Sequence, residues 1–271
     1  MNLTGKVALV LGSVKGIGKA VGLDLARAGA KVVYTWHDWP ESLEGLRREA
    51  AAANPEHLIV NIDLLETGAI DGLLRQTIER FGRLDVLINN IERGGMPVVH
   101  GAYTCEQWDL ELGTTLRAKQ WVFAAALPFL KKSGEGVVVN FSSIAALVGR
   151  SGPASYLFNE GYAAANRGIA LLTETWARLG APEVRVNEIM LGICATRHAE
   201  GTRGWRLLSE AQRQAIVDHT LLGRTGRLED VTAAVRFVVC EAPFMTGSVI
   251  RLDGGYVLGG EPIAPMPPGV V

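Results

Sequence analysis

The chain has 271 residues, 48% of them hydrophobic and 20% charged, a composition that excludes an intrinsically disordered protein. Its 27 basic and 28 acidic residues give a net charge of −1, which provides no electrostatic reason to expect binding to nucleic acid or to an anionic membrane. The three cysteines, Cys105, Cys194 and Cys240, are odd in number and widely spaced, so neither a disulfide framework nor a metal site is predicted.

The cysteine usage and the first residues together predict a cytoplasmic protein. Residues 1–6 carry one basic side chain, and the apolar run Val7–Leu11 that follows is too short for a signal peptide. The longest apolar stretch, Trp121–Leu130, is too short to span a bilayer. We therefore expect no membrane partner.

Short apolar runs alternate along the chain with longer segments of helical periodicity. The expected strands are Val7–Leu11, Val32–Trp36, Leu58–Ile62, Val86–Ile88, Val137–Phe141, Val184–Ile189 and Val249–Leu252. The expected helices are Lys19–Ala28, Glu41–Ala53, Ala69–Phe81, Glu106–Lys132, Tyr162–Leu179, Ser209–His219 and Glu229–Cys240. Strands that are apolar on both faces are typical of a parallel sheet covered by helices. The alternation predicts an α/β fold: a single doubly wound Rossmann domain, with a parallel seven-stranded sheet and helices on both faces.

Two regions depart from this alternation. The polar stretch Arg197–Arg206 contains two glycines and is predicted to be a loop between a strand and a helix, within a substrate loop at about residues 193–220. Residues 260–271 contain four of the eleven prolines, so they cannot form a helix. We expect one domain over residues 1–258 and a proline-rich arm over 259–271.

A glycine-rich turn directly follows the first expected strand. Its sequence, Gly12-Ser13-Val14-Lys15-Gly16-Ile17-Gly18, leads into the first expected helix. Glycines there allow a tight turn and a close approach of the backbone to a pyrophosphate, which the free N–H groups of the helix N-terminus then bind. The alternative is a turn with a purely structural role, but its position between first strand and first helix favours a nucleotide.

The G-x-x-x-G-x-G spacing resembles that of the short-chain dehydrogenase/reductase family, in its standard-length branch. Further stretches resemble motifs of this family over nearly all of residues 6–258, namely Asp63-Leu64, Leu87–Asn90, Asn140–Ser143, Val184–Asn187, Leu191–Thr196, Gly223-Arg224 and Thr246–Gly255. The stretch Ala181–Asn187 also resembles the pteridine-reductase-like side of the family.

The resemblance implies an NAD(P)(H)-dependent oxidoreductase that acts on a carbonyl or alcohol of a small-molecule substrate. The implied cofactor-binding residues are Gly12, Ser13, Lys15, Gly16, Ile17, Gly18, His37, Asp63, Leu64, Asn89, Asn166, Ile193 and Thr196. It also implies a homo-oligomer, a tetramer, whose dimers form along the two longest helices. Trp121 and Trp176 on those helices are expected to supply apolar contact area.

The choice of dinucleotide depends on the end of the second strand. An acidic residue there binds the ribose 2′-hydroxyl of NAD, but Trp36 stands at that position. His37 follows it, and Lys15 lies in the glycine turn, so two basic side chains are available for the 2′-phosphate of NADP. Asp38 is the alternative ribose ligand, and a solvated surface charge is the alternative for Lys15. We predict that NADP(H) is favoured over NAD(H).

The resemblance also implies a catalytic serine and tyrosine. Ser143 matches the serine that holds the substrate oxygen. Two tyrosines compete for the role of proton donor: Tyr156 has the expected spacing from Ser143, whereas Tyr162 begins a stretch that resembles the family's tyrosine helix. We favour Tyr162, with Tyr156 as the alternative.

The family's lysine, four residues after the tyrosine, is missing. Asn166 stands at that position if Tyr162 is catalytic, and Glu160 if Tyr156 is. A neighbouring cation is what favours the phenolate of a tyrosine near neutral pH. The upstream asparagine of the family is also replaced, by Thr115, and Glu92 follows the Asn-Asn pair. Glu92 and Glu160 are therefore candidate proton-transfer groups, and a non-catalytic dinucleotide-binding protein, a sensor or a subunit, is the alternative function.

Overall fold

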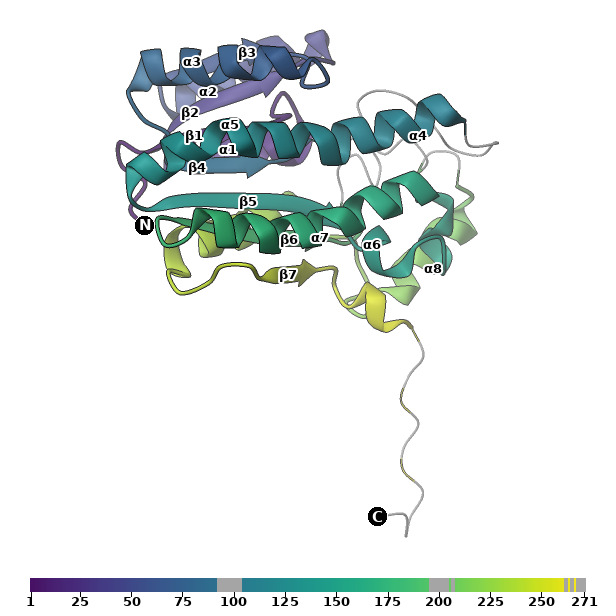
Figure 1. Cartoon of the computed structure of the whole chain (residues 1–271). Helices are drawn as coiled ribbons and strands as arrows, with labels where there is room; N and C mark the ends of the chain where they lie inside the picture. Colours follow the sequence, from purple (N-terminus) through teal and green to yellow (C-terminus); the bar gives the residue numbers. More distant parts are fainter. Residues whose placement is uncertain (92–103, 195–204, 206–207, 261–262, 264–265, 267–271) are drawn as a thin grey trace.

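The seven strands that the structure describes lie in one parallel sheet. The computed structural model describes residues 1–91, 104–194, 205, 208–260, 263 and 266. Its strands are β1 (Val7–Val10), β2 (Lys31–Trp36), β3 (His57–Asn61), β4 (Val86–Asn89), β5 (Gly136–Ser143), β6 (Val184–Leu191) and β7 (Val249–Leu252). They are hydrogen-bonded in the order β3-β2-β1-β4-β5-β6-β7 (Figure 1). The predicted seven-stranded parallel sheet is confirmed.

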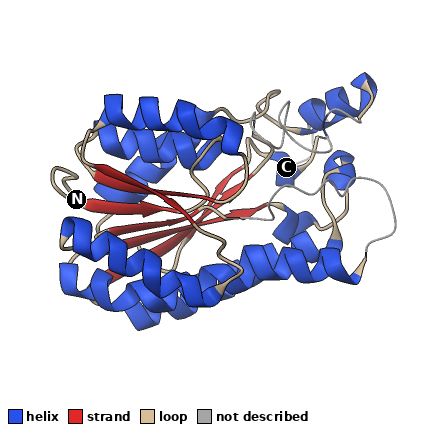
Figure 2. Ribbon diagram, turned by 90° about the horizontal axis from the view of Figure 1, so that it is seen from above, coloured by secondary structure: helices blue, strands red, loops and turns tan. Residues whose placement is uncertain are grey.

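Helices cover both faces of this sheet (Figure 2). They are α1 (Gly16–Arg27), α2 (Leu43–Ala53), α3 (Ile70–Phe81), α4 (Cys105–Leu112), α5 (Ala118–Ser133), α6 (Ala145–Val148), α7 (Glu160–Gly180), α8 (Glu210–His219) and α9 (Leu228–Arg236). Among the described helices, none is both long and apolar enough to cross a membrane.

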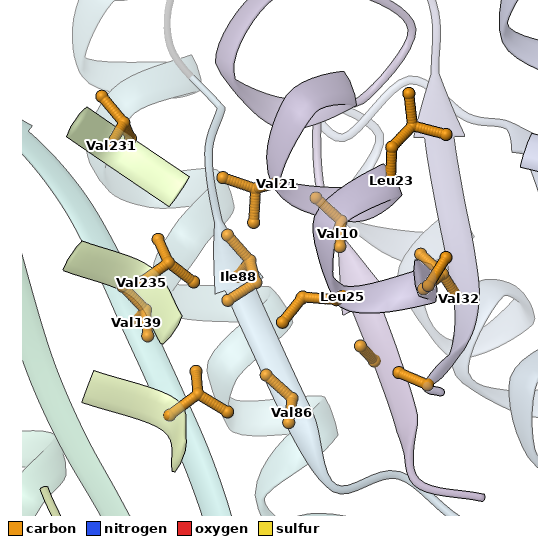
Figure 3. Close-up of a cluster of buried hydrophobic side chains, with 14 of the residues drawn as sticks. Val10, Val21, Leu23, Leu25, Val32, Val86, Ile88, Val139, Val231 and Val235 are labelled. Carbon is orange, nitrogen blue, oxygen red and sulfur yellow. The ribbon is translucent and has the colours of Figure 1, made fainter. Parts of the chain in front are cut away.

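The two faces of the sheet have separate apolar cores. Successive side chains of a strand point to opposite faces. Val10 therefore packs with residues of α1 and α9 (Figure 3), while its neighbour Leu9 belongs to the core shared with α3, α5 and α7. Because β1 is buried on both sides, it has the uniformly apolar sequence typical of a central parallel strand, whereas β6 also contains polar residues.

Two of the expected helices are interrupted. The segment predicted as one helix, Glu106–Lys132, consists of α4, a π-helical turn at Gly113–Arg117, and α5. Within it the hydroxyl of Thr114 donates to the carbonyl oxygen of Leu110 at 2.8 Å, a side-chain bond that competes with the regular helical pattern. The last expected helix likewise ends in a π-helical turn, at Phe237–Glu241. Such turns are frequent at functional sites, and the first of them faces the cavity described below.

Trp176 is a core residue, and its expected place in a contact between subunits is wrong. Its side chain is 1% exposed and stacks on Phe123, with ring centroids 4.4 Å apart. Its ring N–H donates to Oε1 of Gln120 at 3.1 Å. Because its ring is packed and hydrogen-bonded against α5 of its own chain, Trp176 has no exposed surface for a contact between subunits. Trp121, in contrast, is 46% exposed.

The strand order places a crevice at the carboxyl ends of β1 and β4. The chain runs outward from β1 to β2 and β3, then returns to pair β4 on the other side of β1. At such a switch point the loops diverge, and open α/β sheets bind their ligands there. Helices α4, α6 and α8 lie beyond this end of the sheet, on the right in Figure 1.

Candidate functional site

A cavity of about 790 Å³ occupies the carboxyl end of the sheet. At one end it is lined by the glycine turn and by the residues that follow β2 and β3. At the other end it is lined by Ser143, Tyr162 and Asn166, and by Leu191–Cys194 after β6. The cavity thus connects the predicted cofactor site with the predicted catalytic residues, and its volume suits a ligand of cofactor size.

The glycine turn has the geometry of a phosphate-binding loop. Gly12 and Gly16 adopt a positive φ of 59°, which side chains rarely tolerate. A Cβ at Gly18 would lie 2.5 Å from Nδ2 of Asn90 and even closer to the Gly12 carbonyl oxygen. Helix α1 begins here, its N-cap Lys15 makes no side-chain capping bond, and its first turn contains no acidic residue. Its N-terminal N–H groups are therefore suited to an anion such as a pyrophosphate.

Two of the expected cofactor ligands, Ser13 and Asn89, are buried in the protein and are not among the residues that line the cavity. Ser13 is fully buried, and its hydroxyl bonds to the carbonyl oxygens of Val10 and Thr35 at 2.9 and 3.2 Å. Asn89 is fully buried and donates to Oδ1 of Asn140 at 2.7 Å. It is the next residue, Asn90, that lines the cavity. The Asn-Asn motif alone does not indicate which of its amides points outward, because adjacent strand residues face opposite sides.

The predicted adenosine end of the cavity carries both basic candidates. Lys15 and His37 line it together with Trp39, Asp38 and Asp63. Nζ of Lys15 lies 2.9 Å from the ring centroid of Trp39, in a cation–π contact. Nε2 of His37 lies 3.8 Å from Oδ2 of Asp63. The cavity therefore presents both Lys15 and His37 at this end, but it presents Asp38 as well.

At the other end, Ser143 and Tyr162 reach the cavity from β5 and α7. Ser143 is the last residue of its strand, and its Oγ accepts a hydrogen bond from the backbone N–H of Ala145 at 3.2 Å. The side chain of Asn159 caps α7 by accepting from the N–H of Tyr162 at 2.7 Å. This cap sets where the helix begins, and so places Tyr162 in its first turn. Asn166, one turn later, lines the cavity and donates to the Tyr162 carbonyl oxygen at 2.9 Å.

The alternative catalytic residues lie away from the cavity. Tyr156 is 44% exposed and is not among the lining residues. Glu160 is exposed and pairs with Arg150 at 3.2 Å. Backbone hydrogen bonding at the start of α7, together with the Arg150 bond, holds the pKa of Glu160 below its usual value. A carboxylate in this setting remains ionised and does not act as the general acid of the cavity.

Several expected site residues fall outside the described part of the chain. These are Glu92, Thr196 and, within the predicted substrate loop, residues 195–204 and 206–207. Trp205 is the described residue within Arg197–Arg206, and it is 8% exposed in an apolar cluster against which Tyr162 packs. Of the remaining expected cofactor ligands, Leu64, Ile17 and Ile193 all line the cavity.

Sequence reasoning missed a charged residue that lines the cavity, Lys119, and a second one that bonds to a lining residue, Glu188. Lys119 of α5 is 2% exposed, lines the cavity, and donates from Nζ to the carbonyl oxygen of Phe141 at 2.6 Å. Glu188 of β6 is fully buried and bonds to the hydroxyl of Ser142. For Glu188 the signal available in the sequence was a carboxylate within the strand Val184–Leu191, because a buried charge is costly without a partner.

Glu188 predicts a specific pH dependence of stability. Burial raises the pKa of its carboxyl above the ordinary 4.5, partly offset by the Ser142 bond and the nearby charges of Lys119 and Arg167. The folded state therefore holds this proton more tightly than the unfolded chain. Its stabilising contribution is complete below the ordinary pKa and is lost as pH rises through the raised one.

We expect the free energy of unfolding of the wild-type protein, relative to that of Glu188→Gln, to fall as pH rises above the ordinary carboxyl pKa of 4.5. Each unit of raised pKa corresponds to about 1.4 kcal/mol of this difference. Urea unfolding of both proteins across the pH range measures it. Parallel stability curves would contradict the prediction, because a glutamine cannot titrate.

Comparisons with known proteins agree on the family. A family model described as enoyl-(acyl carrier protein) reductase matches residues 12–257. The 3-oxoacyl-[acyl-carrier-protein] reductase of Thermotoga maritima is 31% identical, over 95% of this chain and 100% of its own. A protein of Streptomyces violaceoruber described as ketoacyl reductase 2 of the granaticin polyketide synthase is 38% identical, over 92% of this chain and 95% of its own. The crystal structure of a protein described as a short-chain alcohol dehydrogenase from Sinorhizobium meliloti superposes with a TM-score of 0.82, at 26% identity, over 95% of this chain and 98% of that one.

Proposed function

Because the chain belongs to the short-chain dehydrogenase/reductase family of oxidoreductases, we propose that it reduces the carbonyl of a small molecule with NADPH. The observation that carries the proposal is the continuous cavity that joins the glycine turn to Ser143 and Tyr162. When bound, the cofactor supplies the hydride to the carbonyl carbon. We also infer a cytoplasmic homotetramer with one main domain over residues 1–258.

The roles of the chain's own residues follow from their positions in the cavity. The Ser143 hydroxyl donates a hydrogen bond to the substrate oxygen and orients it. Tyr162 gives its hydroxyl proton to that oxygen as the carbonyl becomes an alcohol. Asn166 offers a neutral amide to the cofactor ribose. Reduction is the favoured direction near neutral pH, because a tyrosine without the family's lysine begins protonated, as an acid must.

Turnover with a carbonyl panel tests the proposal. Two relatives named as reductases of 3-oxoacyl or ketoacyl groups make 3-oxoacyl thioesters the first substrates to try, beside simple ketones and aldehydes. We expect consumption of NADPH that depends on the carbonyl compound. A protein that binds NADPH but reduces no member of the panel would instead be the second candidate, a non-catalytic dinucleotide sensor or subunit. The observation in favour of that candidate is Asn166, whose amide donates within its own helix where the family has a lysine.

NADPH is expected to raise the melting temperature more than NADH does, because Lys15 and His37 both line the adenosine end of the cavity. A ligand present at 100 times its dissociation constant stabilises the folded state by about 2.7 kcal/mol. Lys15→Ala should remove most of the difference between the two cofactors. Lys19→Ala is the matched control, since Lys19 lies on the same helix but pairs with Glu49 at 2.9 Å. A larger rise in melting temperature with NADH than with NADPH would contradict the predicted preference for NADP(H) and indicate Asp38 as the ribose ligand.

A further inference from the structure

The floor of the cavity contains a buried cation that the proposed mechanism has not used. Of all the lysines and arginines that the structure describes, Lys119 is the only one that is buried. It nevertheless lines the cavity, together with Ser143, Tyr162 and Asn166. A buried ammonium is costly unless it is hydrogen-bonded and electrostatically balanced, so its position requires an explanation.

The backbone of β5 holds this ammonium close to the catalytic serine. Nζ of Lys119 donates to the carbonyl oxygen of Phe141 at 2.6 Å, and Phe141 itself lines the cavity. Phe141 precedes Ser143 by two residues in the same strand, a separation of roughly 7 Å in extended backbone. The positive charge therefore lies near the end of the cavity that Ser143 lines, where the substrate oxygen would be oriented.

A buried carboxyl lies close enough to interact with this charge. Glu188 is fully buried on β6, its Oε1 bonds to the Ser142 hydroxyl, and the charge of Lys119 acts on it. Its Oε2 has no hydrogen-bond partner within the described part of the chain. Burial raises the pKa of this carboxyl, so Glu188 stays protonated, and carries no negative charge, up to a higher pH than an exposed glutamate would.

We propose that Lys119, held by the Phe141 carbonyl and lying near Glu188, supplies from α5 the positive charge that Asn166 does not supply from α7. Lys119 acts through Tyr162: its field favours the phenolate, and so lowers the pH at which the tyrosine can accept a proton during alcohol oxidation. This inference rests on the proposed function, because it assigns Tyr162 as the proton-transfer group.

The test compares Lys119→Met, which removes the charge and preserves a long apolar stem, with Lys131→Met. Lys131 lies on the same helix, is partly exposed, and is absent from the cavity wall. We expect Lys119→Met to reduce alcohol oxidation near neutral pH at least tenfold and to move its pH profile upward by about one unit or more. Carbonyl reduction at the same pH should fall with oxidation, because no variant changes the equilibrium constant of the reaction, whereas NADPH affinity should change less than threefold. Asn166→Lys introduced into Lys119→Met should move the profile back.

A second measurement separates the inference from the proposed function. Ionisation of Tyr162 is followed by ultraviolet absorbance as a function of pH. The signal of Tyr162 is the difference between the titration of a protein that has Tyr162 and that of the same protein with Tyr162→Phe. This difference is measured for the wild-type protein and again for Lys119→Met. An upward shift in the ionisation pH of Tyr162 without Lys119 supports the inference even if no carbonyl is turned over. An unchanged titration overturns it, even if the protein is an active reductase.

Loss of the ammonium leaves Glu188 buried without its cation, and Lys119→Met alone could therefore fold poorly. The double variant Lys119→Met/Glu188→Gln removes the ammonium together with the carboxyl that can ionise beside it, and keeps the test decisive. We expect it to show the same upward shifts in both pH measurements. A double variant with the wild-type profile would overturn the inference.

Discussion

Replacing Tyr162 by phenylalanine is expected to lower carbonyl reduction by about 100- to 10,000-fold, the range contributed by a positioned general acid. NADPH binding should change little, because the ring remains and continues to pack on Phe158, whose ring centroid lies 6.1 Å away. Steady-state kinetics and the NADPH-dependent rise in melting temperature measure the two effects separately.

Tyr156→Phe is the matched control for this prediction. Tyr156 is exposed and does not line the cavity, so its hydroxyl should be dispensable for turnover. The opposite outcome, an inactive Tyr156→Phe and an active Tyr162→Phe, would refute the assignment of Tyr162. Glu160 would then stand where the family's lysine is expected.

Replacing Trp176 by alanine is expected to lower the free energy of unfolding by about 3–5 kcal/mol. The substitution removes the largest fully buried side chain among the described residues, its stacking on Phe123 and its hydrogen bond to Gln120. The core between α5, α7 and the sheet cannot close completely around the space left behind. Urea unfolding at a fixed protein concentration measures the loss.

The variant Trp121→Ala tests whether the exposed side of α5 forms a contact between subunits. Trp121 is 46% exposed on α5, so its replacement should change the free energy of unfolding of a single subunit by no more than about 0.5 kcal/mol. If the predicted oligomer forms along α5, light scattering should show weaker assembly for Trp121→Ala and unaltered assembly for folded Trp176→Ala. A wild-type protein that is monomeric at micromolar concentration would refute the predicted oligomer.

The fold could be predicted well because its signals are local. A central strand such as β1 is buried on both faces, as at Leu9 and Val10, so it appears in the sequence as a short apolar run. The turn at Gly12–Gly18 needs a positive φ and room for a close backbone approach, and glycine meets both requirements. The two helix interruptions that the sequence did not predict are also local. They are the π-helical turns at Gly113–Arg117 and Phe237–Glu241, which do not change the helical periodicity enough to be recognised in the sequence.

The arrangement of the site was decided by tertiary structure. Spacing from Ser143 favoured Tyr156, whereas the resemblance of the stretch that begins at Tyr162 favoured Tyr162. In the structure, α7 begins at its Asn159 cap, and Tyr162 is the one of the two that lines the cavity. The lysine sought after the tyrosine was missing from α7, yet a lysine reaches the same cavity from α5, 47 positions before Asn166 in the chain. Sequence patterns report which face of an element is buried, because burial repeats with the period of the helix or strand. Which buried groups then meet depends on how separate elements pack, and that packing brings Lys119, Ser142 and Glu188 together beneath the cavity.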